Sequence, residues 1–188
     1  MAIDPYAAAM ADSRVIERRT ILQGRVLDVG VERVQLPGGR ETELEVLRHP
    51  GAAAILALTP ANEVVLIRQY RHSAGEYLWE VPAGTREADE PPLDCARREL
   101  TEETGFSAQD WTELGEMLPA PGYATEKIHL YLARGLERAE QKLDVDEVIT
   151  DVRPVPVPEA LRWVADGTVS DAKTAVALCR AQLRGLLS

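Results

Sequence analysis

Apolar and polar residues alternate along residues 14–48, as they do in strands that bury one face. In the last of these segments Thr42, Leu44 and Val46 fall on the same face, and the Pro37-Gly38-Gly39 segment marks a turn just before it. Three short strands by themselves are only marginally stable. The pattern therefore predicts a small antiparallel sheet that packs against another surface.

The middle of the chain predicts further strands. Residues 52–59 form a nearly continuous apolar run, which is typical of a strand buried on both faces. The next strand, residues 64–67, leads into the polar segment Arg68-Gln69-Tyr70-Arg71, which we expect at the exit from that strand. The prolines at positions 154, 156 and 158 are expected to end the sheet. Other strands are expected at residues 78–81, 111–118, 127–132 and 148–155.

One segment between these strands has helical periodicity. Leu93, Ala96 and Leu100 recur at the spacing of one helix face. Pro91 and Pro92 precede them, where a missing N–H costs little, and Gly105 suits the left-handed residue that ends a helix. The pattern predicts a helix that packs its apolar face on the sheet.

Two more helices are expected at residues 159–165 and 171–187, the first ended by Gly167 and the second capped by Ser170 or Asp171. Cys95 and Cys179 are both expected to be buried as small apolar side chains. The expected packing face of the last helix consists of Ala175, Leu178, Cys179, Leu183 and Leu186.

The predicted central helix concentrates negative charge. Glu99 and Glu103 are four residues apart and project from one face, with Glu102 on the adjoining edge. Arg98 lies four residues before Glu102 and can form an ion pair with it. Such carboxylates repel one another unless a cation neutralises them, and carboxylate oxygens suit Mg²⁺ or Mn²⁺. By composition alone, the same segment could be an acidic, solvent-exposed helix.

The whole segment from Gly84 to Phe106 resembles the Nudix box, Gly-x5-Glu-x7-Arg-Glu-U-x-Glu-Glu-x-Gly-U, in which U is a bulky apolar residue. The nine specified positions match at Gly84, Glu90, Arg98, Glu99, Leu100, Glu102, Glu103, Gly105 and Phe106. The resemblance implies a mixed-sheet α/β/α sandwich with a small N-terminal β unit. It also implies an enzyme that cleaves a diphosphate linked to another group.

The resemblance assigns roles within the box and beyond it. Glu99, Glu102 and Glu103 would bind metal together with the backbone carbonyl of Ala83. Glu147, with Asp146 as its neighbouring competitor, would bind metal or accept a proton, and otherwise a box glutamate would do so. Gly84, Glu90, Arg98 and Gly105 would hold the box together.

Outside the box, the segment from Arg68 to Gly84 resembles the ADP-ribose pyrophosphatase branch of the family. Arg71 and Arg68 would bind phosphate, since arginine is a natural bidentate partner of a diphosphate. The loop after Pro121 would contribute Gly122 and place Tyr123 against a base or ribose. The expected substrate is ADP-ribose. GDP-mannose, a broader set of nucleotide sugars, and a non-catalytic ligand-sensing module remain alternatives.

The net charge and composition limit the classes of molecule that the protein is expected to bind. The net charge is −10 and the pI about 4.9, which argues against nucleic acid or an anionic membrane surface as a partner. No apolar run approaches the roughly 18 residues of a membrane span. The two cysteines suit a reducing cytoplasm.

The length of 188 residues suits one main domain with an accessory unit. We expect a loose N-terminus at residues 1–13, a sheet at residues 14–48, and a catalytic domain at residues 49–188. In the branch that the chain resembles, such an N-terminal sheet pairs two subunits, so a homodimer is expected. The alternative is that the sheet extends the main sheet of the same chain.

Overall fold

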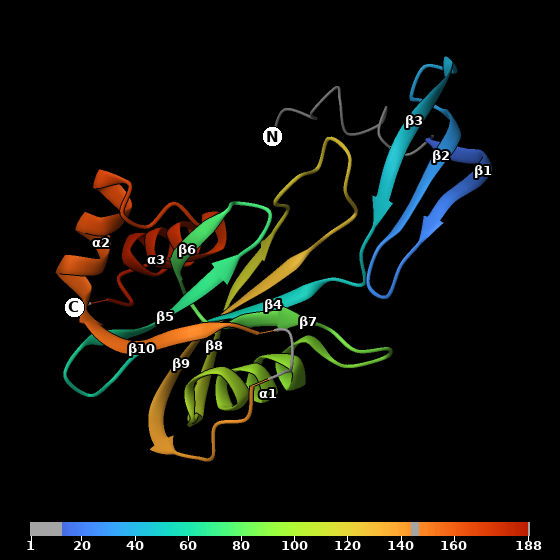
Figure 1. The fold of residues 1–188 in the computed structure, drawn as a ribbon. Helices are drawn as coiled ribbons and strands as arrows, with labels where there is room; N and C mark the ends of the chain where they lie inside the picture. Colours follow the sequence, from blue (N-terminus) through green and yellow to red (C-terminus); the bar gives the residue numbers. More distant parts are fainter. Residues whose placement is uncertain (1–12, 144–146, 188) are drawn as a thin grey trace. The chain divides into compact units, whose positions relative to one another are not determined.

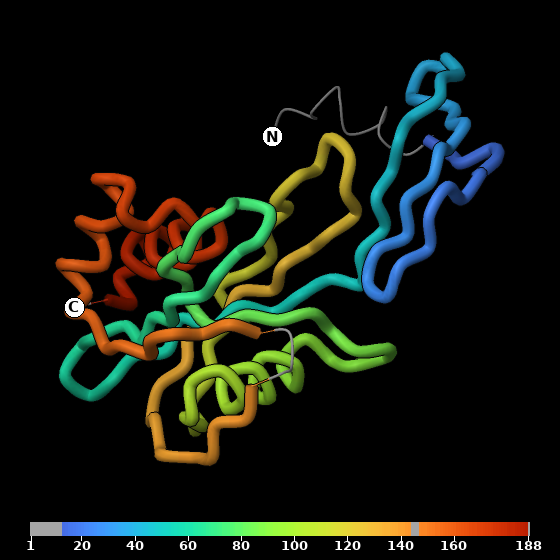
Figure 2. Tube along the Cα trace, in the orientation of Figure 1, coloured from blue at the N-terminus to red at the C-terminus, as the bar shows by residue number. Residues whose placement is uncertain are grey.

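The computed structural model describes residues 13–143 and 147–187, and the chain divides into two compact units (Figures 1 and 2). The first unit comprises the residues up to His49 together with Ala120–Glu126, and the second comprises Pro50–Pro119 and Lys127–Ser188. The expected loose N-terminus lies outside the described residues except for Ser13.

The first unit is a three-stranded antiparallel sheet in the order β1-β2-β3, as the alternation predicted. Its strands are β1 (Arg14–Gln23), β2 (Asp28–Gln35) and β3 (Glu41–Arg48). The loop Ala120–Glu126 is bonded to the end of β3. Leu47 N–H donates to the Tyr123 carbonyl at 2.8 Å, and Thr125 N–H donates to the Leu47 carbonyl at 2.9 Å. A loop from much later in the chain therefore belongs to this unit.

The second unit contains two sheets, ordered β10-β5-β6 and β7-β4-β9-β8 (Figure 1). Strands β4 and β9 run parallel, whereas β7 and β8 pair antiparallel with them, so this sheet is mixed. The strands are β4 (Ala52–Ala57), β5 (Glu63–Arg71), β6 (Glu76–Glu80), β7 (Ala83–Thr85), β8 (Phe106–Met117), β9 (Ile128–Arg138) and β10 (Ile149–Pro156).

The helices of the second unit are α1 (Pro92–Thr104), α2 (Val157–Asp166) and α3 (Ala172–Leu183). Pro92 occupies the first turn of α1, where its missing N–H leaves no hydrogen bond unmade. Gly105 ends the helix in the left-handed region, with φ of 67°. Asp171 caps α3 by accepting a hydrogen bond from the Thr174 N–H at 2.9 Å.

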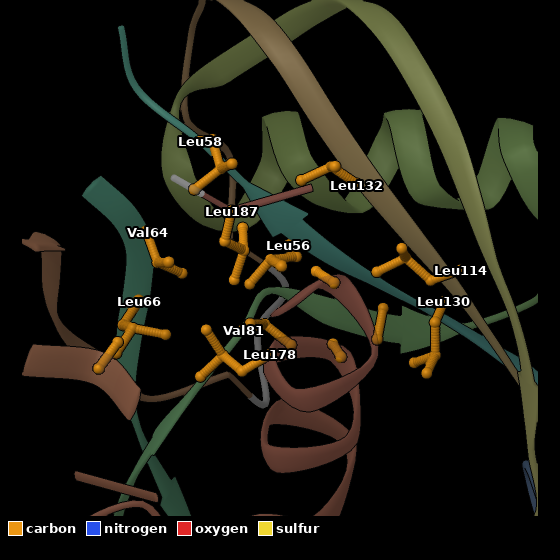
Figure 3. Packing of buried hydrophobic residues seen from close by; sticks show 14 of the residues in the cluster. Leu56, Leu58, Val64, Leu66, Val81, Leu114, Leu130, Leu132, Leu178 and Leu187 are labelled. Carbon is orange, nitrogen blue, oxygen red and sulfur yellow. The ribbon is translucent and has the colours of Figure 1, made fainter. Parts of the chain in front are cut away.

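Strand β4 lies between two apolar cores, and all of its residues are buried. Leu56 belongs to a core that includes Ala160 of α2 and Leu178 of α3, part of which Figure 3 shows. Ile55, the next residue back, belongs to a second core with Leu100 of α1. Because successive strand residues point to opposite faces, the continuous apolar run fills both cores. The result is the predicted α/β/α sandwich.

The structure corrects the predicted ends of several strands. Strand β8 begins at Phe106 rather than at residue 111, and β9 continues to Arg138 rather than ending at residue 132. Strand β10 continues through Pro154 and Pro156, which were expected to break the sheet. It is the outer strand of its sheet, where a proline can be accommodated without removing a ladder hydrogen bond. The Arg68–Arg71 segment lies within β5 rather than after it, because it pairs with β6 on one side and begins to pair with β10 on the other.

The structure also corrects the packing face expected for the last helix. Helix α3 ends at Leu183, whose side chain is 87% exposed, and Cys179 is exposed whereas Cys95 is buried as expected. The residues of α3 that are buried are Thr174, Ala177, Leu178 and Ala181. They also follow helical spacing, so periodicity alone could not choose between the two stripes. Within the described part of the chain, no helix is long and apolar enough to cross a membrane.

Candidate active site

Helix α1 and the segment before β10 bring three carboxylates together. Glu99 and Glu103 lie on α1, and Glu147 lies just ahead of β10. One carboxylate oxygen of each lies within 4.8 Å of the other two. Glu99 and Glu103 are buried and Glu147 is partly buried. The cluster therefore combines two residues on one helix face with Glu147, a residue from a distant segment that the family resemblance had indicated.

Burial makes Glu99 and Glu103 difficult to ionise without a counter-charge. The pKa of Glu99 is raised to about 7, chiefly by loss of solvent; the charge of Glu147 also raises it, whereas Arg98 acts in the opposite direction. Burial and the neighbouring Glu99 raise the pKa of Glu103 well above its ordinary value. A bound cation would favour the ionised form of both groups, so the electrostatics of the cluster suit a metal site.

The contacts of Glu103 also fit a divalent cation. Its Oε2 accepts a hydrogen bond from the Ala83 N–H at 2.7 Å, whereas its buried Oε1 has no hydrogen-bond partner among the described residues. A buried polar atom without a partner is costly. Carboxylate oxygens are preferred ligands of Mg²⁺ and Mn²⁺. Glu99, Glu103 and Glu147 are therefore chemically suited to hold such an ion.

Gly84 lies in β7, directly against the carboxylate of Glu99. A Cβ atom at position 84 would lie 2.0 Å from both Cδ and Oε1 of Glu99. Such an approach is far shorter than any van der Waals contact, so a side chain would displace the carboxylate or the strand. Glycine is required here by close approach and not by an unusual φ angle.

Arg98 connects three carboxylates of the box, those of Glu90, Glu99 and Glu102. Its Nε and Nη2 each donate to the Glu90 carboxylate at 2.9 Å. Its Nη1 donates to Glu99 at 2.6 Å and to Glu102 at 3.0 Å. The guanidinium lowers the pKa of Glu90 to about 2. Glu102 is thus engaged by Arg98, and the described three-carboxylate cluster does not include it.

Arg71, which the sequence analysis named as a phosphate ligand, belongs to a second group of charges whose members Glu80 and Lys173 were not predicted. Its Nε and Nη2 donate to the two oxygens of Glu80 at 2.8 and 2.7 Å, a bidentate ion pair. Lys173 of α3 also ion-pairs with Glu80 and lies 3.0 Å from the Asp171 carboxylate. Glu80 is 1% exposed. The sequence did contain a sign of this group. Glu80 directly follows the apolar residues Leu78 and Trp79, and a charge that is buried beside them needs ionic or hydrogen-bond partners.

The remaining predicted residues lie in varied positions. Arg68 is exposed on β5, and its guanidinium lies 5.1 Å from the ring centroid of Tyr77. Gly122 and Tyr123 belong to the first unit, and the Tyr123 side chain is 62% exposed. Asp146 lies outside the described residues. Among the described residues, Glu147 is the predicted residue outside the box that lies in the carboxylate cluster.

Comparison with known families agrees with the fold and the box. Residues 47–178 match the NUDIX domain. The chain therefore belongs to the Nudix family, and it is a Nudix hydrolase that resembles ADP-ribose pyrophosphatases.

Similar proteins cover most of the chain. It is 37% identical to an ADP-ribose pyrophosphatase of Bacillus subtilis, over 94% of this chain and 96% of that protein. It is 38% identical to a methanol dehydrogenase activator of Bacillus methanolicus, with the same coverage of 94% and 96%. A GDP-mannose pyrophosphatase of Cronobacter sakazakii is 36% identical, over 76% of this chain and 83% of that protein.

A solved structure shares the fold. The crystal structure of an ADP compounds hydrolase superposes with a TM-score of 0.77 and 23% sequence identity, over 94% of this chain and 97% of that chain. At this identity the likeness concerns the fold alone.

Proposed function

We propose that this Nudix hydrolase cleaves the diphosphate of ADP-ribose with water, giving AMP and ribose 5-phosphate. The observation that carries the proposal is the cluster of Glu99, Glu103 and Glu147, whose carboxylate oxygens lie within 4.8 Å of one another. The relative from Bacillus subtilis, named as an ADP-ribose pyrophosphatase, supports the choice of substrate.

In this proposal the three carboxylates hold Mg²⁺ or Mn²⁺, and the Ala83 carbonyl at the start of β7 contributes a further ligand. The metal supplies positive charge that neutralises the diphosphate and lowers the pKa of water. Glu147 accepts the proton of the water that attacks phosphorus. Glu102 is the alternative base, although its ion pair with Arg98 at 3.0 Å makes it less available.

The substrate contacts rest on cations and one aromatic side chain. Arg71 would bind phosphate through the edge of its guanidinium that does not face Glu80. Arg68 would add a second cation. That Gly122 and Tyr123 contact the nucleoside stays a prediction from the sequence. Such local positive charge is necessary because the protein carries a net charge of −10 and the substrate is an anion.

A panel of nucleotide sugars tests the proposal. Each is incubated with the protein and Mg²⁺, and products are identified by mass. ADP-ribose should give AMP and ribose 5-phosphate with the highest kcat/KM of the panel. Glu103→Gln, which keeps size but removes one charge from the cluster, should lower turnover by orders of magnitude while the protein stays folded. Near-wild-type turnover of this variant at saturating Mg²⁺ would contradict the metal assignment.

GDP-mannose is the second candidate substrate, because the Cronobacter sakazakii relative named for it is 36% identical over most of its length. Both substrates join a nucleoside to a sugar through a diphosphate, so the same carboxylate cluster could serve either one. The panel separates them: a higher kcat/KM for GDP-mannose, with GMP as a product, would replace ADP-ribose by GDP-mannose.

A non-catalytic sensing or activating role is the candidate of a different class. The relative named as a methanol dehydrogenase activator, 38% identical, gives this alternative a specific basis. The complete set of box glutamates, Glu90, Glu99, Glu102 and Glu103, favours hydrolysis. Failure of every nucleotide sugar in the panel, with Mg²⁺ and with Mn²⁺, would favour the non-catalytic role.

A further inference from the structure

The segment from Glu80 to Ala83 joins β6 to β7 and ends at the carboxylate cluster. Its last residue, Ala83, donates its N–H to Oε2 of Glu103 at 2.7 Å. Pro82 has a fixed φ, and its carbonyl accepts a hydrogen bond from the Ile55 N–H at 2.9 Å. A displacement early in so short and stiff a segment would therefore be transmitted to Ala83.

The first turn of helix α3 contacts this segment at two successive residues. Lys173 ion-pairs with Glu80, and Thr174 Oγ1 accepts a hydrogen bond from the Val81 N–H at 2.8 Å. The same hydroxyl donates to Oδ2 of the helix cap Asp171 at 2.6 Å. Thr174 and Val81 are both 0% exposed. The Thr174 hydroxyl is thus oriented by Asp171 and satisfies a backbone N–H that water does not reach.

We propose that Thr174 is a positioning residue for the metal site: its hydroxyl fixes Val81, and through Pro82 it fixes Ala83 beside Glu103. The inference rests on the proposed function, because it assumes that the cluster binds a divalent cation. Removing the hydroxyl leaves the Val81 N–H buried without an acceptor, which costs free energy unless the segment shifts. Such a shift moves Ala83 away from the carboxylate that it orients.

Direct titration with Mn²⁺ tests this role without a substrate. Free Mn²⁺ is measured by its electron paramagnetic resonance signal as metal is added to the metal-free protein. Thr174→Val, which keeps the shape but removes the hydroxyl, should bind Mn²⁺ roughly tenfold more weakly, the lower end of the effect of losing an outer-shell partner. Thr174→Ser should restore the wild-type affinity.

A matched control separates positioning from loss of stability. Ala181→Gly lies on the same helix at a fully buried position, so it should lower the melting temperature without changing Mn²⁺ affinity. Thr174→Cys is a second variant for the case that the valine variant is too unstable to measure. Its sulfur is similar in size to the hydroxyl and keeps a weak hydrogen-bond acceptor for the Val81 N–H. It should show an intermediate loss of Mn²⁺ affinity.

The outcomes distinguish this inference from the proposed function. If the wild-type protein binds no Mn²⁺, both the proposed metal site and the role of Thr174 are wrong. If the wild-type protein binds Mn²⁺ and the folded valine or cysteine variant binds it equally well, only the role of Thr174 is wrong. Equal weakening by Ala181→Gly would show that the effect follows stability, and it too would overturn the positioning role.

Discussion

Glu103 has the most demanding environment of the proposed site residues. Its side chain is fully buried, one oxygen accepts the Ala83 N–H, and the other has no hydrogen-bond partner among the described residues. Burial disfavours the charged form of a carboxyl group, and the adjacent Glu99 adds repulsion. The metal-free protein should therefore be under electrostatic strain that a divalent cation relieves.

This strain predicts how the stability of the metal-free protein depends on pH. Glu99 has a folded pKa of about 7, raised from 4.5, so the folded chain binds more protons than the unfolded chain between these values. Raising the pH through this window should therefore destabilise the fold, by up to ~3 kcal/mol from this group. Glu80 and Glu90 have lowered pKa values, so they oppose this trend only near the lower end of the window, where the unfolded chain still binds protons at these positions.

The measurement is the melting temperature in a chelator at pH 5 and at pH 8. It should be lower at pH 8 for the wild-type protein, and the difference should shrink in Glu99→Gln or when Mg²⁺ is in excess. Glu76→Gln, at an exposed position, is the control and should behave like the wild-type protein. Parallel curves for wild type and Glu99→Gln would contradict the prediction.

Glu147 gives a second prediction at the residue scale. As the proposed base it should act mainly in the transition state, so Glu147→Gln should lower kcat more than it raises KM. The expected loss of kcat is about 10²–10⁴-fold. Steady-state kinetics at saturating Mg²⁺ measure both constants.

Asp146→Asn is the matched control, since it removes a charge one position earlier and should have a much smaller effect. If the two substitutions behave alike, or if Glu147→Gln changes only KM, Glu147 is not the base. The base would then be sought in the box, beginning with Glu102.

At the scale of elements, strand β7 and helix α1 form the site by their close approach at Gly84. The added methyl group of Gly84→Ala would meet the Glu99 carboxylate at 2.0 Å, so the strand and the helix must separate or Glu99 must rotate away. Mn²⁺ affinity and kcat should both fall by at least about tenfold, because the ligand geometry changes. Metal titration and nucleotide-sugar hydrolysis measure the two effects.

Ala96→Gly is the control for the contact between β7 and α1. Ala96 is a buried residue of α1 that faces the apolar core, so the substitution lowers stability through helix propensity and lost packing without crowding Glu99. It should leave Mn²⁺ affinity close to that of the wild type. A Gly84→Ala protein with unchanged metal affinity would show that the close approach is not required.

At the scale of the whole molecule, the first unit exposes more apolar surface than an isolated sheet would favour. Val15, Ile21, Leu22 and Leu44 are between 44% and 60% exposed. An accessory sheet with several exposed apolar side chains can use them to bind another copy of the chain. We therefore predict a homodimer formed largely through residues 14–48.

Light scattering at micromolar concentration measures the oligomeric state. The wild-type protein should be a dimer, and Ile21→Glu combined with Leu22→Glu should give a monomer because charge is placed in the interface. Leu183→Glu, at a position of α3 that is 87% exposed, is the control and should stay dimeric. A monomeric wild-type protein would contradict the prediction, and a dimer that survives the double substitution would place the interface elsewhere.

Local features of the sequence determined much of this protein. The alternation at residues 14–48 predicted the three-stranded sheet, and the apolar run from Ala52 predicted a strand buried on both faces. The spacing of Glu99 and Glu103 predicted that they share one face of a helix ended by Gly105. These predictions hold because strand and helix periods are fixed by backbone geometry and act over a few residues.

The tertiary structure alone decided which distant segments meet. It brought Glu147 to Glu99 and Glu103, joined Glu80 to Lys173, and bonded the Tyr123 loop to strand β3. It also chose the buried stripe of α3, since two stripes had the right period. Such contacts depend on how strands pair and how helices pack across the sheet. Residues that are far apart in the chain have no fixed sequence spacing from which their contact could be predicted.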